Sequence, residues 1–170
     1  IVDSNKSRID QWNGPVENLP IYEPGLKEII STVRNKNLFF TNEIEESIDK
    51  AGIIFIAVNT PTKTKGEGKG MAADLTNIHK CTEMIARIST SDKIIVEKST
   101  APVGTGEKIK SVLKSINNKN KFQVISNPEF LAEGTAINDL MNPDRVLIGG
   151  DSSEDGEEAA NIVANIYKSM

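Results

Sequence analysis

The sequence predicts an α/β fold with a doubly wound parallel sheet, and three observations support this. Short runs rich in Ile, Val and Phe alternate with helix-length segments along the chain, the order typical of a parallel sheet covered on both faces. The clearest run, IIFIAV at residues 53–58, is continuously apolar, as expected of a strand buried on both faces. The chain has 170 residues, of which 38% are hydrophobic, so it is about one domain long and apolar enough to form a core.

Other strand-like segments share this apolar composition. They lie at residues 93–97, 122–126 and 145–149, with a weaker one at residues 38–40. Residues 1–3 read as the end of a further strand, followed by a turn and a helix over residues 4–13. Because that strand would lack most of its length, we expect a segment before Ile1 and a sheet that is incomplete at its amino-terminal end.

Amphipathic helices are expected between the strands. Their apolar residues recur at i, i+3, i+4 and i+7, the spacing of a helix with one buried stripe. This spacing occurs at residues 26–33, 109–116 and 159–166, and related patterns mark residues 75–88 and 44–48.

The charge and cysteine content exclude several classes of function. With 20 Lys+Arg against 24 Asp+Glu, the chain has no excess of basic charge for a phosphate backbone, so nucleic acid is not expected as a partner. One cysteine, Cys81, and one histidine, His79, are too few for an intramolecular disulfide or a Cys/His zinc site, and no metal is expected. Cys81 lies on an apolar helix stripe and is expected in the core, whereas His79 should be at the surface. No apolar run is long enough for a membrane span, and a cytoplasmic location fits best.

Polar loops follow three of the expected strands at their carboxyl ends. They are Asn59-Thr60-Pro61, Ser99-Thr100-Ala101-Pro102 and Asn127-Pro128-Glu129. Ligands of open parallel sheets bind in the crevice outside those ends. One such loop would be explained by ordinary turn and capping chemistry, but three aligned loops indicate a site.

Asp3 and Arg8 are candidate contacts for a dinucleotide. Asp3 stands after an apolar strand and before a helix, the place of the acidic residue that hydrogen-bonds the adenosine ribose 2′-hydroxyl. Its charge would repel a 2′-phosphate, which favours NAD over NADP. Arg8 could cover the adenine or a phosphate, and a solvated helix arginine explains it equally well.

Glu129 is the carboxylate best suited to acid/base chemistry. It lies at the mouth of an expected strand and precedes Phe130 and Leu131, an apolar setting that favours general-base work. Residues 61–71, with three lysines, read either as a lid over an anionic ligand or as a solvated basic loop.

Taken together, six segments resemble the UDP-glucose 6-dehydrogenase family. They are IVDSNKSRIDQWN, LPIYEPGL, VNTPTKTKGEGKGMAADL, VEKSTAPVGT, SNPEFLAEGTAINDL and NPDRVLIGG. They occur in the family's order and cover nearly the whole chain. The resemblance implies that residues 1–170 are a partial, Rossmann-type NAD-binding domain, and that a helical linker and a UDP-sugar-binding domain belong to the full protein.

The resemblance also implies a reaction, the oxidation of UDP-glucose to UDP-glucuronate by two NAD molecules in succession. In that family a cysteine thiolate traps the intermediate aldehyde, a second hydride transfer gives a thioester, and water releases the acid. Thr100 matches the hydroxyl that helps place the catalytic water, and Glu129 matches the acid/base. Cofactor contacts are implied for Asp3, Arg8, Val58, Asn59, Thr60, Pro61, Thr62, Ser99 and Glu133. UDP-sugar contacts are implied for Glu129, Phe130, Leu131, Ala132 and Glu133.

Two departures from the family pattern limit what these residues can do alone. The first strand with its glycine-rich turn is missing, and so is the part that carries the nucleophile, because Cys81 matches no part of that motif. We therefore expect the 170 residues alone not to oxidise UDP-glucose, and the full protein to be a homo-oligomer without nucleic-acid or membrane partners. The alternatives are a dehydrogenase acting on UDP-N-acetylmannosamine or GDP-mannose, and a non-catalytic nucleotide-binding module.

Overall fold

The computed structural model describes all of residues 1–170 and confirms a parallel sheet flanked by helices. The elements are α1 (Lys6–Asn13), the 3-10 helix η1 (Val16–Asn18), α2 (Leu26–Val33), α3 (Ile44–Lys50), β1 (Ile53–Ile56), α4 (Thr76–Ile88), β2 (Lys93–Glu97), α5 (Thr105–Ile116), β3 (Phe122–Ser126), α6 (Ala136–Met141) and α7 (Glu154–Lys168). They divide into two compact units, each described by itself. Unit 1 holds Ile1–Ser47 and Phe130–Arg145, and unit 2 holds Ile48–Glu129 and Val146–Met170.

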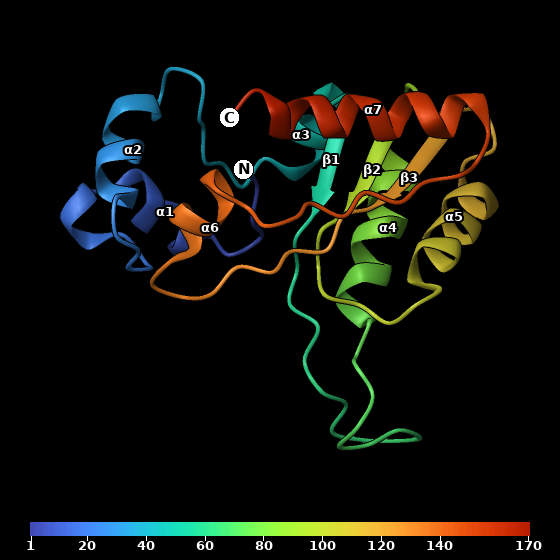
Figure 1. Cartoon of the computed structure of the whole chain (residues 1–170). Coiled ribbons are helices and arrows are strands. Elements are labelled where there is room, and N and C mark those ends of the chain that lie inside the picture. Colours follow the sequence, from blue (N-terminus) through green and yellow to red (C-terminus); the bar gives the residue numbers. More distant parts are fainter. The chain divides into compact units, whose positions relative to one another are not determined.

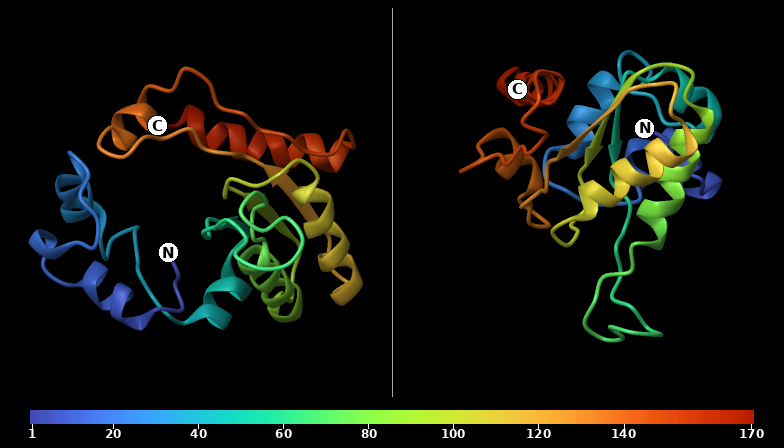
Figure 2. Two further views of the ribbon diagram at one scale, coloured as in Figure 1. Left: turned by 90° about the horizontal axis from the view of Figure 1, so that it is seen from below. Right: turned by 90° about the vertical axis from the view of Figure 1, so that its right-hand side faces the viewer.

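Unit 2 contains the sheet, whose three parallel strands are ordered β1-β2-β3. Helix α7 lies on one face of this sheet, and α4 and α5 lie on the other (Figure 1 and Figure 2). Ile56 is opposite Glu97, and Glu97 is opposite Ser126. The carboxyl ends of the three strands therefore form one level edge.

The two faces of the sheet have different cores because successive side chains of a strand point to opposite sides. Val96 and Ile125 pack against Ala159 and Val163 of α7, and all four are at most 2% exposed. On the other face, Gly106 of α5 stands against Glu97 and Val124. Full burial of one aliphatic side chain contributes about 2 kcal/mol, so these layers hold the strand ends rigidly.

Unit 1 has a small core of its own around Ile9, Ile30 and Phe40. Trp12 stacks on Phe40 with ring centroids 4.9 Å apart. Arg34 closes this core by donating hydrogen bonds from Nη1 to the carbonyls of Trp12 and Gly14. These contacts position the short helices α1 and α2, which are too short to be stable in isolation.

Three predicted strand segments are not formed. Residues 145–149 make a single antiparallel bridge, in which Ser126 and Gly149 exchange two backbone hydrogen bonds of 2.7 and 2.8 Å. The weak strand at residues 38–40 and the strand end at residues 1–3 are also absent. Within unit 1, Val2 makes one isolated parallel bridge with Thr41, and Leu38 makes another with Arg34. Apolar composition favours strands at these three places, but none of the segments has a neighbouring strand along its length.

The first strong strand is shorter than predicted, because β1 ends at Ile56 rather than at Val58. Beyond that point the Ser99 hydroxyl donates to the carbonyls of Ile56 and Val58. A side chain thus takes the place of a partner strand. The 3-10 helix η1 and α6 were not predicted, because each is too short to show a helical repeat. None of the helices combines the length and the apolar character needed to cross a membrane.

Candidate functional site

The three predicted polar loops leave the sheet as neighbours within unit 2. The Ser99 hydroxyl donates to the Val58 carbonyl at 2.6 Å, and the Thr60 hydroxyl donates to the Thr100 carbonyl at 2.8 Å. The Asn127 N–H donates to the Glu97 carbonyl at 3.0 Å, which ties the third loop to β2. The predicted residues that this edge brings together are Val58, Asn59, Thr60, Ser99, Thr100 and Glu129.

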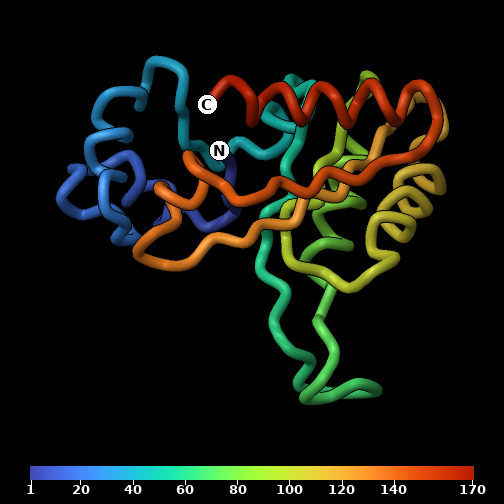
Figure 3. The backbone as a smooth tube through the Cα atoms, in the orientation of Figure 1, coloured from blue at the N-terminus to red at the C-terminus, as the bar shows by residue number.

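The loop after β1 is held in place by helix α4 as well. Asn77 Nδ2 donates to both the carbonyl and the Oδ1 of Asn59, at 3.1 and 3.0 Å. Sequence reasoning missed Asn77, although an amide in the first turn of a helix that follows a long loop is a recognisable signal. Beyond Pro61 the chain leaves the sheet as an extended arm, visible in the tube of Figure 3. An antiparallel bridge between Thr62 and Ala73 closes this arm.

Glu129 lies in a polar setting, which corrects the apolar setting predicted for it. Its side chain is 47% exposed, and its Oε2 lies 3.9 Å from Lys98 Nζ. The side chain of Lys98 is only 17% exposed, and its Nζ is 6.0 Å from the centroid of the Tyr167 ring. No local sequence pattern connects Tyr167 with this loop, because the two lie far apart along the chain. Lys98 could have been noticed, since it directly follows a buried strand.

A second carboxylate, Glu97, lies beneath the candidate site on the face of the sheet that α5 covers. Glu97 is 4% exposed, and burial raises the pKa of its carboxyl, while the hydrogen bond from Ser126 lowers it by less. Ser126 Oγ donates to Oε2 at 3.2 Å, and Oε1 has no partner. A buried oxygen without a partner is costly when it carries charge.

Replacement of Glu97 by Gln should change how stability depends on pH. Because its folded-state pKa lies above the ordinary value of 4.5, Glu97 contributes stability below that value and loses it as the pH rises through the folded-state pKa. Gln cannot titrate, so the stability of Glu97→Gln relative to the parent should increase as the pH rises above 4.5. Denaturant unfolding at several pH values measures the difference in the free energy of unfolding between variant and parent. Glu107→Gln on α5, where the side chain is 76% exposed, is the control. If this difference changed with pH equally for both variants, the raised pKa of Glu97 would be contradicted.

Pro61 and Thr62 belong to unit 2, and the other predicted site residues, Asp3, Arg8 and Phe130 to Glu133, belong to unit 1. Asp3 lies between the Val2–Thr41 bridge and α1, and its Oδ1 accepts a hydrogen bond from Asn5 N–H at 2.8 Å. Arg8 is an exposed residue in the first turn of α1. A turn and a helix follow Asp3 as expected from the sequence, but the strand expected before it is reduced to a single bridge at Val2.

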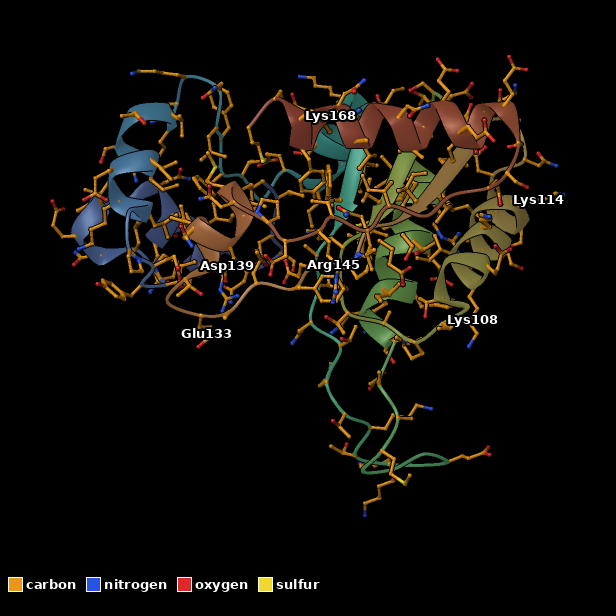
Figure 4. All side chains as sticks on the ribbon, viewed as in Figure 1. Lys108, Lys114, Glu133, Asp139, Arg145 and Lys168 are labelled. Atoms are coloured by element: carbon orange, nitrogen blue, oxygen red, sulfur yellow. The ribbon has the colours of Figure 1, made fainter.

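The segment from Phe130 to Glu133 precedes α6 and is mostly exposed. Phe130 is 58% exposed, and the guanidinium carbon of Arg145 lies 5.2 Å from its ring centroid. Leu131 is half-buried, and Ala132 N–H donates to Asp139. Glu133 is an exposed carboxylate, labelled with Asp139 and Arg145 in Figure 4.

His79 lies at the surface as expected, whereas Cys81 is only partly buried rather than part of the core. Cys81 is a free, half-buried thiol on α4, and burial raises its pKa, which disfavours the reactive thiolate. His79 is 58% exposed, with Nδ1 3.6 Å from Glu83 Oε1. The structure has no cluster of three or more His, Cys, Asp or Glu side chains that could hold a metal ion.

Comparisons with known proteins agree with this arrangement. Residues 1–170 match the UDP-glucose/GDP-mannose dehydrogenase family, NAD binding domain. The chain is 53% identical over 167 residues to UDP-glucose 6-dehydrogenase 1 of Glycine max, covering 98% of this chain and 34% of that protein. It therefore spans about a third of the length of the curated relatives it matches.

Solved structures of the same kind superpose closely. A UDP-glucose dehydrogenase from Pyrobaculum islandicum has a TM-score of 0.81 at 32% identity, with 98% of this chain and 37% of that one covered. A GDP-mannose dehydrogenase from Pseudomonas aeruginosa has a TM-score of 0.84 at 28% identity, with 99% and 38% covered. The match over the full chain, the parallel sheet and the three tied loops at its carboxyl edge lead to one conclusion: this chain belongs to the UDP-glucose/GDP-mannose dehydrogenase family, as an NAD-binding domain.

Proposed function

We propose that the protein oxidises UDP-glucose to UDP-glucuronate in two successive hydride transfers, and that this chain supplies the NAD-binding part and the acid/base Glu129. One observation carries the proposal: hydrogen bonds and register gather the loops of Ser99, Thr100 and Glu129 at one edge of the sheet, in a chain 53% identical to UDP-glucose 6-dehydrogenases. Loops that hydrogen-bond to one another, rather than only capping the helices that follow them, are typical of a preorganised site.

The residues at this edge fit a dinucleotide by their chemistry. The loops after β1 and β2 offer hydroxyls and an amide on Asn59, Thr60 and Ser99, which are short side chains that let a cofactor approach the backbone. In unit 1, one oxygen of Asp3 is held by Asn5, and its carboxylate provides acceptors for ribose hydroxyls. When bound, NAD accepts the hydride from the sugar carbon. We assign the remaining cofactor contacts to Arg8, Val58, Pro61, Thr62 and Glu133.

In this proposal Glu129 transfers the proton and Thr100 positions the catalytic water molecule. The carboxylate of Glu129 is half-exposed, so it can accept a proton from a substrate hydroxyl and return it to solvent. Thr100 is exposed, and its backbone is held by Thr60, so its hydroxyl can orient a water molecule by hydrogen bonding. The UDP-sugar contacts are proposed for Glu129, Phe130, Leu131, Ala132 and Glu133.

The whole protein would need parts that these residues do not supply. The chain spans about a third of its curated relatives, and its single cysteine is a half-buried helix residue. We therefore place the nucleophilic cysteine, the linker and the sugar-binding domain outside residues 1–170. A reducing, cytoplasmic setting suits the free thiol, and assembly into a homo-oligomer stays a prediction from the family resemblance.

The substrate proposal predicts a preference among nucleotide sugars. The full-length protein should produce NADH with UDP-glucose at a kcat/KM at least about 100-fold above that with UDP-N-acetylmannosamine or GDP-mannose, because a misfit sugar leaves buried polar groups unpaired. Absorbance of NADH gives the rates, and residues 1–170 alone should give none. A preference for GDP-mannose would favour the alternative that the Pseudomonas aeruginosa structure suggests. NAD binding without turnover on any sugar would favour the non-catalytic module.

A further inference from the structure

A buried amide that the proposed chemistry does not use lies two residues before Glu129. Asn127 is 1% exposed, yet both ends of its side-chain amide are occupied. Its Nδ2 donates to the Leu147 carbonyl at 2.8 Å, and its Oδ1 accepts a hydrogen bond from the Tyr167 hydroxyl at 2.5 Å. With its backbone N–H donating to the Glu97 carbonyl, Asn127 is fixed from three sides.

Tyr167 contacts the surroundings of Glu129 a second time through its ring. Lys98 Nζ lies 6.0 Å from the ring centroid, within the range of a cation–π contact. The same ammonium is 3.9 Å from Glu129 Oε2. One residue near the end of α7 therefore touches both the loop that carries Glu129 and the cation that faces its carboxylate.

The half-exposed position of Glu129 explains why such support matters. A glutamate side chain has several rotatable bonds, and most of its rotamers would point away from a bound substrate. Pro128 stiffens the backbone between Asn127 and Glu129. The hydrogen bond from the Tyr167 hydroxyl to Asn127 then fixes the start of the loop. Lys98 favours those Glu129 rotamers in which the carboxylate lies beside its ammonium group.

We propose that Tyr167 is a positioning residue for Glu129, acting through Asn127 and Lys98. This inference rests on the proposed acid/base role of Glu129. It adds a residue from the distant helix α7 to a site that the sequence motifs confine to the strand-end loops.

The test is steady-state kinetics of UDP-glucose oxidation by the full-length protein. Tyr167→Phe keeps the ring and its packing but removes the hydroxyl that holds Asn127. Because small misplacements of reacting groups are costly, kcat should fall about tenfold while KM for NAD stays within about twofold. Tyr22→Phe, at a tyrosine that is 80% exposed, is the matched control and should leave kcat unchanged.

A second pair of variants tests the route through Lys98. Lys98→Met removes the charge but keeps an apolar stem, and kcat should fall about fivefold; Lys98→Arg keeps the charge and should restore at least half of the parent rate. If Tyr167→Phe fails to fold, as circular dichroism would reveal, this pair carries the test.

A double-mutant cycle separates this inference from the proposed function. In a Glu129→Gln background, Tyr167→Phe should change the residual kcat by less than about twofold, because its effect passes through the Glu129 carboxylate. The same tenfold fall in kcat in both backgrounds would overturn the positioning role and leave the proposed function intact. A Tyr167→Phe effect confined to a higher KM for NAD would do the same. Full turnover by Glu129→Gln alone would instead overturn the proposed function.

Discussion

Glu129→Gln in the full-length protein should lower kcat for UDP-glucose oxidation by about 10²–10⁴-fold, the usual contribution of a positioned acid/base. The substitution keeps the size and hydrogen-bonding capacity of the side chain but cannot exchange a proton at neutral pH. Because cofactor contacts are assigned to other loops, the Kd for NAD should stay within about twofold. NADH absorbance measures the rate, and fluorescence titration with NAD measures binding.

Glu107→Gln is a suitable control for that experiment. Glu107 lies on α5, its side chain is 76% exposed, and it pairs with Lys110 rather than with the site. Its kcat should match that of the parent. Unchanged turnover in Glu129→Gln would contradict the acid/base role of Glu129 and favour the alternative, a non-catalytic nucleotide-binding module.

Ile125→Ala should lower the free energy of unfolding by about 4 kcal/mol, near the upper part of the range for buried aliphatic truncations. Ile125, the last residue but one of β3, is 0% exposed and packs with Val96, Ala159 and Val163. The truncation leaves a cavity between the sheet and α7, which the neighbouring strand and helix backbones cannot close. Denaturant unfolding followed by circular dichroism gives the difference.

The matched comparison is Ile162→Ala on α7, where the same side chain is 39% exposed. It should lower the free energy of unfolding by about 1 kcal/mol or less, because little apolar surface is returned to water and no closed cavity forms. Similar losses in the two variants would mean that α7 does not pack on the sheet as described.

Much of the fold could be predicted because its main elements have strong local signals. The continuous apolar runs predict β2 and β3 with the bounds that the structure has, since a strand buried on both faces needs no polar alternation. The amphipathic spacing likewise predicts α2, α4, α5 and α7. The strand expected at residues 145–149 does not form, because a high strand propensity alone does not provide a neighbouring strand for hydrogen bonding. Only Gly149 finds one, in Ser126.

The candidate site could be predicted in part for a similar reason. Parallel strands end at one edge of a sheet, so the sequence predicts that the loops of Thr60, Ser99 and Thr100 lie together. The residues next to Glu129 in sequence do not predict its polar surroundings, because its ammonium neighbour Lys98 lies directly after the adjacent strand β2. Reading only the apolar residues that follow Glu129 in sequence gave the wrong setting.

The sequence alone was enough to identify a parallel α/β domain, its family resemblance and the loops at which chemistry is expected, because those features depend on local composition and on motifs contiguous in the chain. The support of Glu129 became visible only in three dimensions. Tyr167 and Asn127 are 40 positions apart and share a 2.5 Å hydrogen bond. That bond exists because α7 packs across the sheet and brings its last turn to the end of β3, a contact made by packing that no local pattern encodes.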